Sequence, residues 1–89
     1  MANKRDLKKS VNFICSELFA ECVAVKHYNK ELAQADVDPV MVRILTLQSE
    51  MLSRANHIEK FAVRAYIKKL REDFNKETSE IIDAITALI

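Results

Sequence analysis

Residue types suited to metal or nucleophilic chemistry are few in this 89-residue chain. Its two histidines, His27 and His57, stand outside the E-x-x-H, H-E-x-x-H and C-x-x-C patterns that hold zinc or a di-iron centre. Cys22 and His27 are five residues apart in the sequence. On a helix that spacing turns them about 140° from one another, too far to share one ion. The sequence therefore predicts no metal site.

The two cysteines, Cys15 and Cys22, fit neither a disulfide nor a catalytic role. Seven residues along one helix separate two Cα atoms by about 10 Å, whereas a disulfide needs about 4.4–6.8 Å. A nucleophilic thiolate must be accessible and close to a base, and both cysteines belong to an apolar helix side. The chain contains no glycine, so it has no phosphate-cradling loop. We therefore expect no catalytic residue and no cofactor, and we predict that the protein is not an enzyme.

Basic residues are unevenly spread, although the formal net charge of +1 gives no global attraction to nucleic acid or membranes. Four cations in the last third of the chain recur at steps of four, four and three, so they share one side of a helix. If the first and last helices run parallel, this stripe meets the basic N-terminus at one end of the bundle. We name this set the basic pole: Lys4, Arg5, Lys8, Lys9, Lys60, Arg64, Lys68 and Arg71. It is a candidate site for phosphate, nucleic acid or an acidic partner, and the alternative is a solvated surface.

The segment from Phe13 to Val25 is apolar over most of the circumference of a helix, because ten of its thirteen residues are apolar. A helix on the surface of a monomeric bundle needs an apolar stripe only a little over 100° wide. The excess favours self-association, and Glu17 and Glu21 are interpreted as a narrow solvated strip rather than a catalytic acid pair. Near the C-terminus, Ile82 and Ile89 extend the apolar stripe of the last predicted helix. The predicted self-association residues are Phe13, Cys15, Phe19, Val23, Ile82 and Ile89.

These residues must be positioned by helices, because Ala, Leu, Glu, Lys, Arg and Met are plentiful and the tight turns of hairpins lack their usual glycine. The apolar period predicts a first helix over residues 4–34. Asp38 followed by Pro39 is typical of an N-cap and first helical position, which predicts a second helix over 39–56. No Gly or Pro follows, but the apolar stripes before and after Asn56 differ in phase by about 100°. A break between Asn56 and Phe61 removes this conflict and predicts a third helix over 60–88.

The fold class is accordingly all-α, with one domain over residues 1–89 arranged as a three-helix up–down–up bundle. The alternative is a long two-helix hairpin. Apolar residues make up 49% of the chain and charged residues 30%, which is compatible with a packed domain. The sequence has no secretory signal, and its most apolar stretch is too short and too charged to span a bilayer. We expect a cytoplasmic protein without a membrane partner.

Two runs near the N-terminus, NKRDLKK at residues 3–9 and ICSELFAEC at residues 14–22, resemble the opening of a known family. It is an uncharacterised family of short bacterial all-helical proteins, and the resemblance covers about the first quarter of the chain. It implies a compact helical bundle of bacterial origin. Because the family carries no assigned activity, the resemblance transfers no functional residue.

The sequence thus favours a non-enzymatic interaction or assembly protein that acts as a homo-oligomer, with a dimer as the simplest closed form. A protein partner of unknown identity is compatible with the same surface. The alternative is a nucleic-acid or phosphate-ligand binding module that uses the basic pole.

Overall fold

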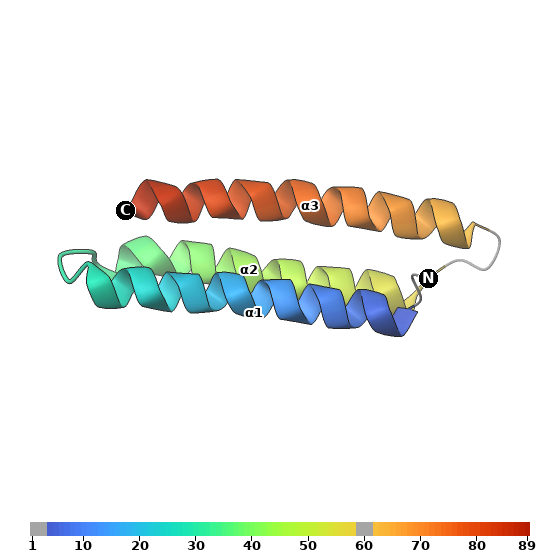
Figure 1. Cartoon of the computed structure of the whole chain (residues 1–89), viewed down its shortest axis with the longest axis horizontal. Coiled ribbons are helices and arrows are strands. Elements are labelled where there is room, and N and C mark those ends of the chain that lie inside the picture. The colour runs from blue at the N-terminus through green and yellow to red at the C-terminus, as the bar shows by residue number, and fades with distance from the viewer. Residues whose placement is uncertain (1–3, 59–61) are drawn as a thin grey trace.

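Three α-helices run the length of the computed structural model, which describes residues 4–58 and 62–89, with only the backbone of residue 4. They are α1 (Lys4–Tyr28), α2 (Gln34–Asn56) and α3 (Val63–Leu88). α1 and α2 lie side by side and antiparallel, and α3 runs parallel to α1 (Figure 1). The bundle is elongated, with extents of 51 × 19 × 18 Å. This is the predicted up–down–up bundle, and the alternative two-helix hairpin is wrong.

The core is one continuous column of apolar side chains between the three helices. α3 buries the stripe predicted from its sequence, because residues three and four apart share one helix face. Its buried members are Ile67, Leu70, Phe74, Ile81 and Ile85. α1 contributes Leu7, Val11, Cys15, Leu18 and Cys22, and α2 contributes Val37, Ile44, Leu47, Met51 and Ala55.

The first connection differs from its prediction. α1 ends at Tyr28 rather than at residue 34, and α2 begins at Gln34 rather than at Pro39, which lies inside the helix. Ala33 occupies the N-cap position without a side-chain hydrogen bond, so the predicted Asp38 cap is wrong. The physical reason is Val37, which is fully buried and continues the core stripe of α2 towards the N-terminus. Its burial outweighs the single backbone hydrogen bond that the proline removes.

The second connection lies where the phase conflict predicts it. α2 ends at Asn56 and α3 begins at Val63, while the predicted start at residue 60 falls outside the described residues. The Tyr66 hydroxyl donates a hydrogen bond of 3.0 Å to the Arg54 carbonyl oxygen. The same carbonyl oxygen accepts a backbone hydrogen bond from the His57 N–H, so the Tyr66 contact ties the start of α3 to the C-terminus of α2.

Candidate functional site

The outer surface shared by α1 and α2 is apolar and carries no charged side chain over its central part. We name it the uncharged face. Ser16, Phe19 and Ala20 of α1 and Leu45 and Gln48 of α2 line a shallow cavity of about 290 Å³ between the two helices. Phe13 and Val23 share the side of α1 that carries Ser16 and Ala20, because they follow at steps of three and four. On α2, Val42 and Ser49 line a groove with Leu45. The face as a whole therefore comprises Phe13, Ser16, Phe19, Ala20 and Val23 of α1 with Val42, Leu45, Gln48 and Ser49 of α2. It is a distinct feature in a chain whose residues are 30% charged.

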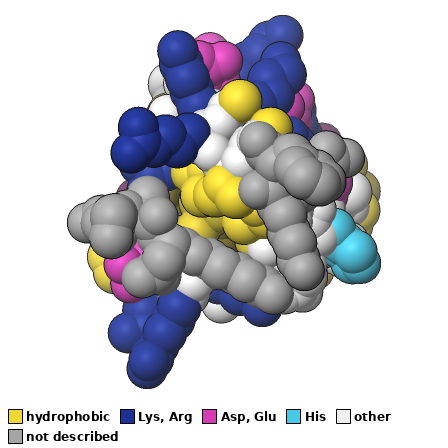
Figure 2. Space-filling model, turned by 90° about the vertical axis from the view of Figure 1, so that its right-hand side faces the viewer, with side chains coloured by type: hydrophobic (Ala, Val, Ile, Leu, Met, Phe, Trp, Pro, Cys, Tyr) yellow, Lys and Arg dark blue, Asp and Glu magenta, His cyan; other side chains and the backbone are white. Residues whose placement is uncertain are grey.

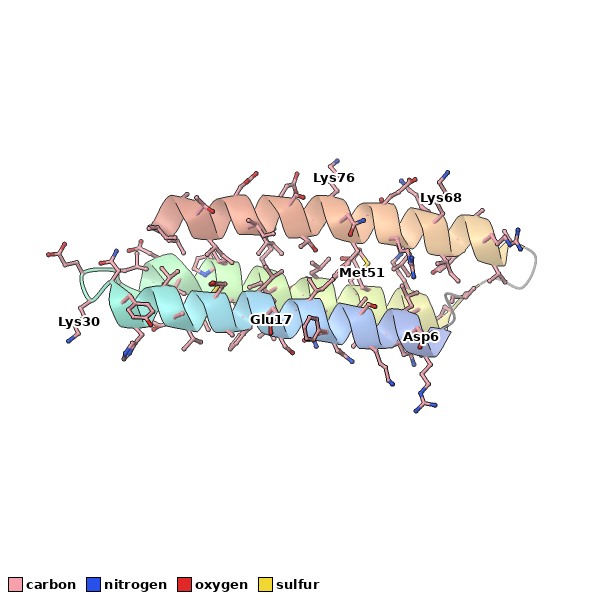
Figure 3. All side chains as sticks on the ribbon, viewed as in Figure 1. Asp6, Glu17, Lys30, Met51, Lys68 and Lys76 are labelled. Carbon is pink, nitrogen blue, oxygen red and sulfur yellow. The ribbon has the colours of Figure 1, made fainter. Side chains whose placement is uncertain are left out.

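Large hydrophobic side chains are substantially exposed on this face. The exposed fractions are 67% for Phe13, 51% for Val23, 60% for Val42 and 52% for Leu45. Glu17, labelled on α1 in Figure 3, and Glu50, which lines a groove on α2 together with Val42, Leu45 and Ser49, mark its borders. Contiguous exposed apolar surface rimmed by polar residues often marks an interaction site.

The opposite side of α2, which faces α3, has the reverse character. The Arg43 guanidinium lies 3.1 Å from a Glu77 carboxylate oxygen and 2.8 Å from one of Glu80. Nearer the other end of the helix, Arg54 contacts Asp73 at 3.0 Å. Charges therefore follow the seam between α2 and α3, whereas a neutral amide pair crosses the α1–α2 seam, with Gln48 Nε2 donating to Asn12 Oδ1 at 2.8 Å.

The predicted self-association residues divide between three environments. Phe13, Phe19 and Val23 lie on the uncharged face, with Phe19 also packing against the core. Cys15 is 1% exposed and belongs to the core, so its assignment to the association surface is wrong. Cys15 completes the buried stripe of α1, which turns it inwards. Ile82 is exposed on α3, and Ile89, which follows α3, is exposed beside Val25 and Tyr28 at the end of α1, so neither belongs to the uncharged face.

Two residues of the face, Val42 and Leu45, were not anticipated from the sequence. Leu45 is 52% exposed, and the leucine of this segment that is buried is Leu47. The signal that could have found them is a run on α2 in which Val42, Leu45 and Ser49 follow at steps of three and four without a charge. Such a run covers one side of a helix.

The basic pole gathers at one end of the bundle but does not form one site. Arg5, Lys8 and Lys9 line a hollow together with Asn12 on the α2 side of α1. A separate groove of about 540 Å³ runs along α3 over an apolar floor and includes Arg64, Lys68 and Arg71. Figure 2 shows this end, where Lys and Arg side chains are spread around hydrophobic side chains rather than collected in one cleft. The side chains of Lys4 and Lys60 lie outside the described residues.

The two cysteine thiols are both buried and free. Burial raises the pKa of Cys15, and burial with the neighbouring Glu21 carboxylate raises the pKa of Cys22. Both therefore remain protonated near neutral pH, since a thiol ordinarily loses its proton only near pH 8.5. Within the described ranges 4–58 and 62–89, no group of three or more His, Cys, Asp or Glu side chains is placed to hold a metal ion.

Comparison with known proteins adds no relative. The chain matches no family model, and neither a curated protein nor a solved structure is significantly similar to it. Among the described residues, no helix is long and apolar enough to cross a bilayer.

Proposed function

We propose that this protein is a non-enzymatic assembly protein that acts as a homodimer through the uncharged face. The observation that carries this proposal is the concentration of exposed Phe13, Val23, Val42 and Leu45 on one side of α1 and α2 without a charged residue among them. Removing such a surface from water is favourable by roughly 25 cal/mol for each Å² buried.

A second copy of the chain fits this surface because a two-fold dimer brings the same patch of both subunits together. Burying a charge without a partner is costly. Two copies of the uncharged face can pack against each other without that cost, because neither contributes a charged side chain. The polar members of the face, such as Ser16 and Ser49, carry hydroxyl groups that can bond to one another or to bound water. The bordering Glu17 and Glu50 stay at the rim, where solvent screens them.

The test compares two charge insertions of equal chemistry and similar starting exposure. Leu45→Glu places a carboxylate in the centre of the proposed interface, and Ile82→Glu places one on α3, outside it. Light scattering after size-exclusion chromatography at tens of micromolar should give a dimer for the wild type and for Ile82→Glu, and a folded monomer for Leu45→Glu. Circular dichroism checks that both variants keep their helices.

A wild-type mass near 10.2 kDa would refute the homodimer. A Leu45→Glu variant that stays dimeric would instead refute the assigned face. Leu45 is a better probe than Phe19, because Phe19 also packs against the core and its replacement would disturb the fold.

A second candidate function is binding of phosphate groups or nucleic acid at the basic pole. The observation that favours it is that Arg64, Lys68 and Arg71 line one groove and form no ion pair among the described residues. Titration with RNA, DNA and heparin at about 50 and 200 mM salt tests it, because phosphate contacts give a steep salt dependence. No binding at the lower salt would exclude this function.

The proposal also includes the origin of the protein and its location in the cell. The resemblance of its N-terminal runs to short bacterial helical proteins supports a bacterial origin, and we propose a cytoplasmic location. Neither statement adds a substrate or a catalytic step.

A further inference from the structure

The charges of this bundle are divided along its long axis. α1, α2 and α3 pass the middle of the bundle near residues 16, 45 and 75, which separates residues 5–16, 46–58 and 62–75 from residues 17–45 and 76–89. The Asn12–Gln48 and Arg54–Asp73 contacts support this level assignment, since each joins two helices within the first group. We name the first group the basic half and the second the acidic half.

The two halves carry opposite net charges of the same size. Among residues with described side chains, the basic half has eight Lys or Arg and four Asp or Glu, and the acidic half has four and eight. The difference is +4 in one half and −4 in the other. Since the molecule is 51 Å long and 19 Å wide, these charges make it an elongated electric dipole.

We infer that the two subunits of the homodimer pack end-reversed, with the basic half of each subunit beside the acidic half of the other. This inference rests on the homodimer proposed above and adds the orientation of the partner. A two-fold axis across the helices at the middle of the uncharged face produces this arrangement, with α1 antiparallel to α1 of the second copy. The other face-to-face arrangement, with the axis along the helices, would place like halves side by side.

Besides Glu17 and Glu50 at the borders of the face, charged residues towards the ends of α1 and α2 are arranged to act on this choice. Lys8 and Lys9 lie on α1 near one end, where they line a hollow with Asn12. Asp38 lies on α2 near the other end, with its Oδ1 accepting a hydrogen bond of 2.6 Å from Gln34. The end-reversed dimer brings the two lysines towards the second copy's acidic half, twice over by symmetry. The parallel dimer places the lysines of both subunits at one end and Asp38 of both subunits at the other.

The salt dependence of the dimer separates the two orientations by its sign. Ions screen exposed charges over about 10 Å at 0.1 M salt. Raising NaCl from 0.05 to 0.5 M should therefore weaken an end-reversed dimer, with a rise of about three- to tenfold in its dissociation constant if two or more exposed pairs contribute. The same change should strengthen a parallel dimer, because it screens repulsion.

Two Lys→Glu variants with the same change in net charge test the inference at single residues. Lys9→Glu reduces the charge of the basic half and should weaken the end-reversed dimer about three- to tenfold at low salt. Lys76→Glu makes the acidic half more negative, at a side chain that points away from α1 and α2 (Figure 3), and should leave affinity unchanged or raise it. A parallel dimer requires the opposite order.

A distance measurement completes the test. Lys30 is exposed in the connection after α1, so a Lys30→Cys variant carries one spin label at the end of each subunit, while the unmutated protein serves as the blank for the buried Cys15 and Cys22. Labels in an end-reversed dimer should lie about one bundle length apart, 51 Å, and labels in a parallel dimer about one bundle width apart, 19 Å.

A dimeric mass with the long distance and salt weakening supports the inference. A dimeric mass with the short distance, or a dimer that tightens in salt, overturns the orientation and leaves the homodimer intact. A monomeric mass overturns the homodimer itself and the orientation with it.

Discussion

The two sides of α2 solve the same packing problem with different chemistry. Towards α3, Arg43 and Arg54 reach acidic side chains at 2.8–3.1 Å. Towards α1 and solvent, Val42 and Leu45 remain more than half exposed, beside a neutral amide pair at the seam. The side of α2 that faces α3 therefore holds its charged groups in ion pairs, whereas the side that faces α1 and solvent leaves apolar side chains exposed.

The ion pairs define position more than they supply stability. The partners of Arg43 are 40–47% exposed, and exposed pairs of this kind contribute about 0–1 kcal/mol. Burial of apolar side chains stabilises the fold more, by roughly 1.5–3 kcal/mol for each large one. The charged seam therefore fixes how α3 lies against α2, while the core holds it there.

The largest expected effect tests whether the apolar core or the ion pairs hold α3 against α2. Leu70 is fully buried in α3, so Leu70→Ala should lower the free energy of unfolding by about 2–5 kcal/mol through lost burial and a cavity. Arg43→Met, which keeps the aliphatic stem but removes both ion pairs, should cost at most about 1 kcal/mol. Urea unfolding at one fixed protein concentration measures both. Equal losses for the two variants would mean that the ion pairs hold α3.

A smaller effect is expected at Thr78, beside the Glu77 that binds Arg43. Its hydroxyl oxygen is buried and has no hydrogen-bond partner among the described residues, and an unsatisfied buried group costs about 1–3 kcal/mol. Thr78→Val should therefore stabilise the protein, by about 1 kcal/mol. Thr86→Val is the matched control, because the exposed Thr86 hydroxyl donates to the Ile82 carbonyl oxygen at 2.9 Å. A loss of stability at Thr78 would indicate that its hydroxyl is satisfied in solution.

The helices and their order were predictable because burial follows periodicity in α3. Ile67, Leu70 and Phe74 recur at helical steps and are all buried, and the phase conflict near Asn56 located the second connection. The first connection was misplaced because Asp38 and Pro39 form a local start signal, whereas Val37 is held by contacts that only the folded bundle provides. A local helix-start signal does not set the helix boundary where burial in the folded protein favours an earlier start.

The surfaces were less predictable than the core. Phe13 and Val23 were correctly separated from the core of α1, but Cys15 was not, since a continuous apolar stretch does not reveal where the neighbouring helices lie. Leu45 shows the same problem on α2, where it lies outside the core although its residue type is typical of one. The sequence predicts the basic pole at one end, yet which side of each helix it occupies depends on the rotation of the helices in the bundle.

The smallest effect concerns the charged seam and depends on pH. Hydrogen bonds from Lys69 first, and from Arg54, lower the pKa of Asp73 below its ordinary value. The folded state therefore favours the carboxylate, so the contribution of Asp73 to stability is present above the unfolded pKa of about 4 and is lost as pH falls through the lower folded value. Asp73→Asn should be less stable than the wild type near pH 7, and the two should converge towards about pH 2.

Urea midpoints measured between pH 2 and 7 check this expectation, with Asp83→Asn as the control. Asp83 is exposed on the same helix and forms no ion pair among the described residues, so its substitution should give a smaller difference that changes less with pH. A constant gap between wild type and Asp73→Asn would mean that the Lys69 and Arg54 contacts do not favour the charged form. The charged side chains between α2 and α3 would then distinguish that seam from the uncharged face without adding stability. Only the apolar residues would account for a difference in stability between the two sides of α2.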